Sequence, residues 1–289
     1  MKKIYSLIST SFLFVAGFSQ NVTVPPPNIS GTENYVYTRE YLEETSTSNS
    51  SVPQIQSVTY FDGLGREKQK INIKASSSGK DVVTRMEYDA LGRQVMNFLP
   101  MPQQNTTNGE IYSSATTPYT EAIGNPLYGG IAPFFSKNEI EYSPLNRPLS
   151  TTAPGDWSAN NKKVTVEYKF NIAGEVKKYT TVTSWSNGVT SSALNVSGTY
   201  SASQLYKTIT TDEDSNVSVE YKDKLGQIVL VRKVVSTTEN ADTYYVYNEY
   251  QDLAYVLSPL ASVKSTLTAT DLDELCYQYR YDDKSRLAE

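Results

Sequence analysis

The sequence predicts an all-β protein in which consecutive β-hairpins join into a continuous curved antiparallel sheet. Two observations support this prediction. The 289 residues include 23 tyrosines together with many threonines, serines and valines, a composition typical of pleated, half-exposed strands rather than of helices. A short turn motif also recurs along the chain at intervals near 28 residues. Fixed periods of this size are typical of proteins in which one supersecondary unit stacks on the next.

The first 19 residues have the features of a secretory signal peptide. Lys2 and Lys3 precede a mostly apolar stretch, and cleavage is expected after Ser19. A membrane anchor is the alternative, but a spanning helix needs about 20 strongly apolar residues, and this stretch is shorter and contains several serines and threonines. We therefore expect an exported protein without a membrane span after cleavage, located at the cell surface, outside the cell or in the periplasm.

Three further segments are expected to interrupt the hairpins. Residues 20–53 are rich in Pro, Ser and Thr and predict a flexible leader, with one candidate strand at Tyr35–Tyr41. Residues 101–137 contain several prolines and a Gly-Gly pair, which predicts an irregular insertion. Residues 258–275 are expected to hold one short helix, because Thr270 can cap it and acidic residues follow.

The turn motif consists of a tyrosine, an acidic or polar residue, two spacers, a glycine or asparagine, and an arginine. The copies begin at Tyr60, Tyr88, Tyr142, Tyr168, Tyr221, Tyr250 and Tyr281, and they are separated by 28, 54, 26, 53, 29 and 31 residues. Two separations are nearly double the others. We therefore expect two further units that are degenerate in sequence or replaced by insertions.

The motif has the chemistry of a tight hairpin turn. Tyrosine ends one strand, and aspartate at the first turn position accepts hydrogen bonds from the amides ahead of it. Glycine or asparagine supplies a positive φ angle, and arginine begins the returning strand. Residues assigned to these structural turns are Tyr60, Asp62, Gly65, Arg66, Tyr88, Asp89, Gly92, Arg93, Tyr142, Asn146, Arg147, Tyr221, Gly226, Tyr281, Asp282 and Arg286.

The aspartates of these turns have an alternative interpretation as metal ligands or catalytic acids. A fixed place in a repeated turn favours the structural interpretation. The arginines are likewise expected to pair with a neighbouring turn or carbonyl group. A single hairpin is marginally stable in water, so the units are expected to stack side by side and bury one another's apolar faces.

The residue content excludes several classes of chemistry. The chain has no histidine, which removes the commonest general base and metal ligand. Its one cysteine, Cys276, cannot form an internal disulfide and is expected to be a small buried residue. The net charge of -5 and the absence of a basic cluster argue against a nucleic-acid partner. No glycine-rich phosphate-binding loop was found, so no cofactor is expected.

Two carboxylate-based alternatives stay open. Residues 212–216 have an Asp-x-Asp-x-Asn spacing like the start of a calcium loop, but Val217 stands where such a loop needs glycine. A solvated acidic turn is the preferred interpretation, and no metal site is expected. A glycosidase could act with two carboxylates alone, but no carboxylate lies in an apolar setting that the sequence reveals. The chain is therefore expected not to be an enzyme.

The Tyr-Asp-x-x-Gly-Arg unit resembles the YD repeat of Rhs and teneurin-type proteins. Residues 60–100, with two copies of the unit and Phe98-Leu99-Pro100, resemble an amino-terminal domain of unknown function that precedes such repeats in many exported bacterial proteins. Residues 143–157 and 276–282 are similar to further signatures of this region. The resemblance implies an amino-terminal Rhs-associated domain at 54–157 and YD repeats at 158–289.

The resemblance implies a β-sheet wound into a hollow shell, which in many relatives encloses a carboxy-terminal toxin or effector. The chain is then expected to be a fragment, with the rest of the shell and its effector as partners. A cell-surface adhesin that binds glycans through exposed tyrosine and tryptophan residues, such as Trp157 and Trp185, is the alternative function. A carboxylate-based glycoside hydrolase is the remote one.

Overall fold

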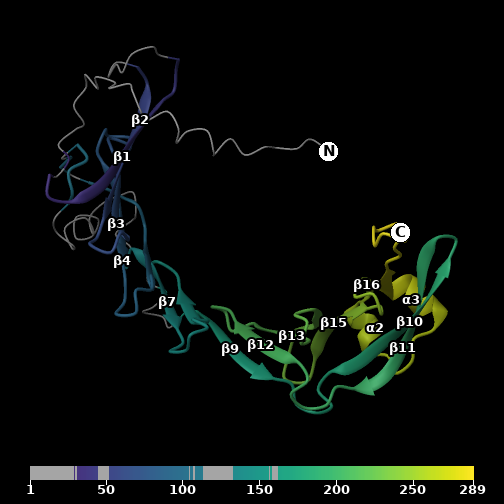
Figure 1. The fold of residues 1–289 in the computed structure, drawn as a ribbon. Helices are drawn as coiled ribbons and strands as arrows, with labels where there is room; N and C mark the ends of the chain where they lie inside the picture. The colour runs from purple at the N-terminus through teal and green to yellow at the C-terminus, as the bar shows by residue number, and fades with distance from the viewer. Residues whose placement is uncertain are drawn as a thin grey trace. The chain divides into compact units, whose positions relative to one another are not determined.

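The computed structural model describes residues 29, 31–44, 52–103, 105–106, 108–112, 133–155, 157 and 162–289. The expected signal peptide lies outside these residues, as do parts of the expected leader and of the insertion at 101–137. Within them the regular secondary structure is almost entirely antiparallel strand, with two short helices near the end of the chain (Figure 1). The prediction of an all-β fold made of hairpins is confirmed.

The chain divides into two compact units, Met1–Phe134 and Phe135–Glu289. The boundary expected between residues 157 and 158 falls inside unit 2. The candidate strand at Tyr35–Tyr41 corresponds to the first strand of unit 1, which pairs along its whole length with the second.

Unit 1 is an antiparallel sheet with the strand order β1-β2-β3-β4-β5, and the short β6 pairs with β4. Adjacent strands in this order also follow one another along the chain, as successive hairpins require. The strands are β1 Asn34–Tyr41, β2 Gln54–Phe61, β3 Glu67–Asn72, β4 Val82–Glu87, β5 Met96–Phe98 and β6 Met101–Pro102.

The core of unit 1 follows the two-residue period of its strands. Val58 and Tyr60 on β2, Ile71 on β3 and Val83 on β4 are buried together, while their neighbours in sequence are more exposed. Asp81, just before β4, is fully buried. Its carboxylate accepts hydrogen bonds from the amides of Lys74 and Gly109 and from the hydroxyl of Tyr112. Asp81 therefore fixes the segment before residue 113 against the sheet.

Unit 2 is an antiparallel sheet with the strand order β7-β8-β9-β12-β13-β14-β15-β16-β17, and β10 and β11 form a separate two-stranded ribbon. The elements are β7 Phe135–Ile140, β8 Pro148–Thr152, β9 Val164–Phe170, β10 Lys177–Ser186, β11 Val189–Thr199, β12 Tyr206–Thr211, β13 Val217–Lys222, β14 Ile228–Val234, β15 Asn240–Tyr247, β16 Leu253–Leu257, α2 Pro259–Ser262, α3 Ala269–Leu275 and β17 Cys276–Gln278.

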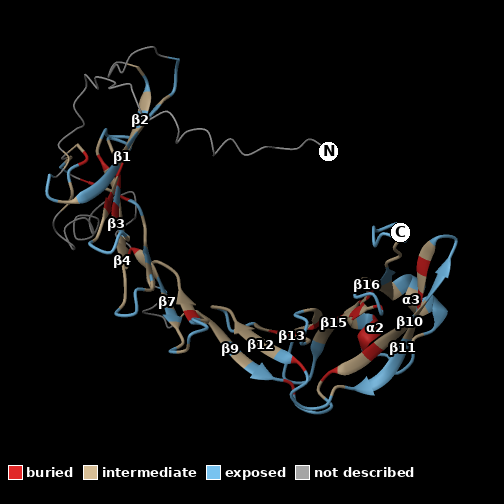
Figure 2. Ribbon diagram, viewed as in Figure 1, coloured by how far each residue is buried: buried red, intermediate tan, exposed pale blue. Residues whose placement is uncertain are grey.

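The ribbon and the helix α2 cover the sheet of unit 2. The rings of Tyr179 on β10 and Tyr244 on β15 meet edge to face, with centroids 5.0 Å apart. The amide of Lys177 donates to the Tyr244 hydroxyl at 3.2 Å. In unit 2, Figure 2 shows buried residues on the sheet near α2 and the ribbon, and the largest buried cluster joins β13, β15 and β16 to α2 and β10. The main core of unit 2 therefore lies between its sheet and the segments that cover it.

The connection between β16 and β17 holds two short helices rather than the one expected. Ser258 caps α2, and Thr268 caps α3. Thr270, the expected cap, lies inside α3, because Thr268 and Asp271 form a reciprocal capping box. No helix in the described ranges is both long and apolar enough to cross a bilayer.

Candidate functional site

The repeated turn has one set of hydrogen bonds, which the copy at Asp89 shows in full. The Asp89 amide donates to the carbonyl of Arg93, and the Gly92 amide donates to the carbonyl of Asp89. One carboxylate oxygen accepts the amides of Leu91 and Arg93, both at 2.9 Å, and the other accepts Nε of Arg93 at 2.8 Å. Gly92 has a φ of 76°. The aspartate thus holds both the backbone of the turn and the arginine that follows it.

The copies at Asp62 and Asp282 repeat this geometry with Arg66 and Arg286. The positive φ is supplied by Gly65 in the first copy and by Ser285 in the second. Hydrogen bonds from Arg286 lower the pKa of Asp282 to about 2. The pKa values of Asp62 and Asp89 are also lowered, first by the backbone amide of the arginine in the same turn.

Tyrosine connects one turn to the turn before it. The guanidinium carbon of Arg66 lies 4.4 Å from the ring centroid of Tyr88, and the Tyr88 hydroxyl donates to the carbonyl of Glu67 at 2.9 Å. Arg147 and Tyr168 form the same stack at 4.3 Å. The same hydrogen bond recurs in two other copies. The Tyr168 hydroxyl donates to the carbonyl of Pro148, and the Tyr281 hydroxyl donates to the carbonyl of Leu253. Each of these three tyrosines therefore reaches the residue that follows the preceding turn.

The turn predicted at Tyr142 differs from the others. Tyr142 is 96% exposed, because the turn is longer and begins at Glu141, whose amide donates to the carbonyl of Arg147. Glu141, not Ser143, holds the Arg147 side chain, at 2.8 Å, and its pKa is lowered to about 2 by that hydrogen bond first. Asn146 does take the positive φ, at 50°.

Tyr60 and Tyr221 are core residues rather than members of their turns. Each stands two residues before the aspartate of its turn, and each is fully buried. Tyr60 donates to the carbonyl of Gly109 at 2.7 Å, and Tyr221 donates to the carboxylate of Glu175 at 2.7 Å. Strand alternation explains this placement, because residues one and two places before the turn point to opposite faces.

The structure also shifts the start of the copy predicted at Tyr250. This turn begins at Asn248, whose side-chain oxygen accepts the amides of Tyr250 and Asp252. Gln251 occupies the positive-φ position. In the preceding copy, Gly226 has a φ of 84° as the motif requires, and the aspartate is Asp223.

Three further copies lack the full set of sequence signals of the motif. Residues 212–216 form one, with Asp212 accepting the amides of Asp214 and Asn216 and with Ser215 at positive φ. This turn is the sequence that resembled a calcium loop. Residues 76–80 form another, with a serine in place of the aspartate. An acidic or hydroxyl residue followed three places later by Gly, Asn or Ser is the signal that would have found both.

The third further copy is split by the ribbon. Asn171 accepts the amides of Gln204 at 2.9 Å and Leu205 at 2.8 Å, and the Ser203 amide donates to the Asn171 carbonyl. The ribbon is therefore inserted within a single repeat turn. This insertion accounts for the doubled separation between Tyr168 and Tyr221.

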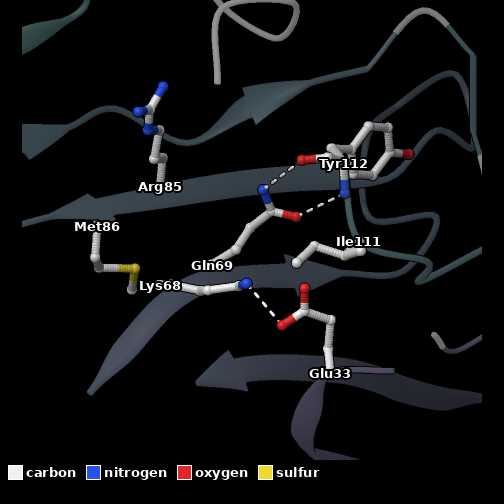
Figure 3. A pocket seen from close by; sticks show the side chains of 7 residues that line it. All are labelled: Glu33, Lys68, Gln69, Arg85, Met86, Ile111 and Tyr112. Carbon is white, nitrogen blue, oxygen red and sulfur yellow. Dashed lines mark hydrogen bonds and ion pairs between the residues drawn. The ribbon is translucent and has the colours of Figure 1, made fainter. Parts of the chain in front are cut away.

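Figure 3 shows the pocket of unit 1, a cavity of about 340 Å³ beside β3 and β4. The Lys68 ammonium pairs with Glu33 at 2.7 Å. The Gln69 side chain exchanges two hydrogen bonds with the backbone of Tyr112. Since these polar groups already have protein partners, the pocket offers a ligand few unpaired groups. It is lined by Glu33, Lys68, Gln69, Arg85, Met86, Ile111 and Tyr112.

Unit 2 has a pocket of about 240 Å³ between the ribbon and the turn edge of the sheet. Tyrosines form much of its wall, and carboxylate and amide side chains contribute the rest. Its lining includes Tyr179, Tyr200, Asp223, Gln227, Tyr244, Tyr245, Tyr247, Asn248 and Gln251. Across the described residues, no group of three or more acidic or cysteine side chains is placed to hold a metal ion.

Comparison with known proteins gives one family match. A family profile described as "Domain of unknown function (DUF6443)" matches residues 33–170. This range includes all of 54–157, the region that resembles an amino-terminal domain of unknown function. No curated protein matches the chain.

Two solved structures are similar to parts of the chain. The first is titled "Crystal Structure of TcdB2-TccC3", with a TM-score of 0.45 and 13% identity over 83% of this chain and 10% of that chain. The second, "Crystal Structure of TcdB2-TccC3 without hypervariable C-terminal region", has a TM-score of 0.21 and 12% identity over 81% of this chain and 15% of that chain. This chain thus spans a small fraction of either length.

Proposed function

We propose that this chain is a structural segment of an exported YD-repeat protein, in which successive hairpins build the wall of a β-sheet shell around an effector. The connection between successive turns carries the proposal. Each tyrosine that bonds to the preceding turn fixes the spacing between neighbouring hairpins, which is the requirement of an extended wall.

The chemistry of the turns fits a structural role better than a catalytic one. In the copies at Asp62, Asp89 and Asp282, both carboxylate oxygens are occupied by the turn's own amides and arginine. A catalytic acid or a metal ligand needs an oxygen directed at a substrate or an ion. We therefore propose that the chain has no enzymatic activity of its own.

The experiment is the intact mass of the native product, captured from cells and medium with an antibody against residues 54–289. We expect a much larger species in which the segment beyond the shell resists protease until the shell is unfolded. The capture from medium and from osmotically released periplasm also tests export. A native species no longer than this chain would contradict the shell function.

A second candidate function is a surface adhesin that binds glycans. The observation that favours it is an exposed aromatic pair, in which Trp185 near the tip of the ribbon is 48% exposed and Tyr250 in the turn between β15 and β16 is 54% exposed. Their ring centroids lie 6.2 Å apart. Aromatic faces of this kind stack on sugar rings. Binding on a glycan array that Trp185→Ala removes would support the adhesin, and an array without signal would oppose it.

A further inference from the structure

The turn at residues 223–227 departs from the rule of the repeat. Asp223 accepts the amides of Leu225 and Gln227, both at 2.9 Å, so its backbone geometry matches that of the Asp89 copy. The fifth residue is Gln227 instead of arginine, and its side chain turns away to donate to the carbonyl of Gln251 at 3.2 Å. In the described part of the chain, the second carboxylate oxygen of Asp223 has no hydrogen bond or ion pair.

Tyr247 occupies the place that Tyr88 has in the earlier copy. It immediately precedes the first residue of the next turn, Asn248. A hydrogen bond with the backbone of Ile228, the residue after Gln227, contributes to its pKa. In the earlier copy, the ring of Tyr88 is covered by the guanidinium of Arg66. Among the described residues, no lysine or arginine lies over the ring of Tyr247.

The pocket of unit 2 lies where this arginine is absent. Asp223, Gln227 and Tyr247 all line it. After burial, the charge of Asp223 is the next cause that raises the pKa values of Tyr247 and of Tyr200, which also lines the pocket. The carboxylate is therefore close to both rings. The Nζ of Lys178 lies 5.7 Å from the centroid of the Tyr200 ring.

We propose that this pocket binds a guanidinium or alkylammonium group of a ligand, in the place that an arginine side chain of the protein occupies in the turns at Asp62, Asp89 and Asp282. The ligand cation would lie against the Tyr247 ring and donate hydrogen bonds to the free oxygen of Asp223. Cation–π attraction and a charge-assisted hydrogen bond both strengthen when the group is partly removed from water. Departures from a local structural rule are also expected at functional positions.

Titration calorimetry of the full chain with arginine amide tests the proposal, and citrulline amide serves as a neutral control of nearly the same shape. We expect saturable binding of arginine amide and none of citrulline amide. A peptide with a single arginine, compared with its citrulline counterpart, distinguishes a polypeptide ligand from a free cation, because a polypeptide ligand should bind more tightly than arginine amide. Equal binding of the charged and neutral probes would overturn the proposal.

Three variants make the test specific. Asp223→Asn should weaken binding of arginine amide about tenfold or more, since it removes a charged acceptor. Asp252→Asn removes an acid from the next turn, outside the pocket, and should leave binding unchanged. Gln227→Arg should return the motif to its usual form, abolish binding by filling the site, and raise the melting temperature.

The Gln227→Arg variant separates this proposal from other uses of the pocket. A Gln227→Arg protein that folds and binds arginine amide with unchanged affinity would contradict it.

Discussion

At the scale of single residues, the repeat depends on a residue that accepts two amides and on a residue that tolerates a positive φ. The first position is filled by Asp, Asn or Ser, or by Glu in the longer turn that begins at Glu141, and the second is filled by Gly, Asn, Ser or Gln. The sequence motif identified the copies with Asp and Gly, because these two residue types signal a turn strongly. It missed those with weaker residues, since the hydrogen bonds of a turn can persist when its consensus does not.

Substitutions at Gly226 and Gly92 can distinguish two costs of adding a side chain, which are backbone strain and contact with a neighbouring side chain. Both have positive φ, but a Cβ on Gly226 would meet no atom within 4 Å, whereas a Cβ on Gly92 would lie 3.3 Å from Nη1 of Arg66. Gly226→Ala should lower the free energy of unfolding by about 1–2 kcal/mol, the strain of a left-handed residue with a side chain. Gly92→Ala should lower it further, because Arg66 must also move. Urea denaturation measures both.

The control for these substitutions is Gly226→Asn. It should be less destabilising than Gly226→Ala, because asparagine tolerates this conformation and Asn146 occupies it in another turn. If the asparagine and alanine variants were equally destabilised, left-handed strain would not be the cause.

At the scale of elements, the hairpins could be predicted because the residues of each turn are adjacent in the sequence. The ribbon could not be predicted, because it separates the residues of the turn into which it is inserted. Asn171 and Ser203 belong to one turn, but the ribbon separates them in sequence. The alternation of strand residues also explains why Tyr60 and Tyr221 are assigned by the motif to turns but lie in the core. A tyrosine beside a turn lies on one face or the other according to its distance from the turn, and the motif does not fix that distance.

Asn171 tests whether the split turn holds the ribbon to the sheet. Its side chain accepts two amides and donates to the carbonyl of Ser201 at 2.8 Å, and the residue is 2% exposed. Asn171→Ala leaves the buried amide of Leu205 without this acceptor. We expect a loss of about 2–4 kcal/mol in unfolding free energy, since each unsatisfied buried group costs about 1–3 kcal/mol. Hydrogen exchange should show faster opening of β10 and β11.

Asn171→Asp is the matched variant, because it keeps the acceptor oxygen and loses the donor. If the amides of Gln204 and Leu205 are the important partners, it should destabilise the chain less than Asn171→Ala at neutral pH. Unchanged exchange rates in the ribbon of the alanine variant would show that the split turn does not anchor it.

At the scale of the whole molecule, stability should depend on pH at both ends of the scale. In acid, the relevant groups are Glu141 and Asp282, whose pKa values are lowered to about 2 from ordinary values of 4.5 and 3.8. A lowered pKa in the folded state stabilises it above the ordinary value, and this contribution is lost as the pH falls towards the folded value. We expect the melting temperature to fall progressively between about pH 4.5 and pH 2.

The acid prediction is checked by calorimetry across this pH range. Glu141→Gln and Asp282→Asn should each reduce the slope of melting temperature against pH. Glu274→Gln, at an exposed acid without an ion pair in the described part of unit 2, should leave the slope unchanged. An identical slope in all four proteins would show that the turn carboxylates do not set the acid limit.

In alkali, the buried tyrosines of unit 2 should set the limit. Burial raises the pKa of Tyr179 to about 12 and also raises that of Tyr221, where the hydrogen bond to Glu175 adds to the effect. A raised pKa in the folded state means that the contribution to stability is complete below the ordinary value of 10 and is lost as the pH rises through the folded value. Absorbance at the tyrosinate band should therefore show a late-titrating fraction that appears together with unfolding.

Tyr179→Phe removes one such group and leaves its ring in place, so it should reduce that fraction and the pH dependence of melting between about pH 10 and pH 12. Tyr142→Phe, which alters an exposed ring, should change neither, and a late fraction that survives the loss of Tyr179 unaltered would assign the alkaline limit to other tyrosines.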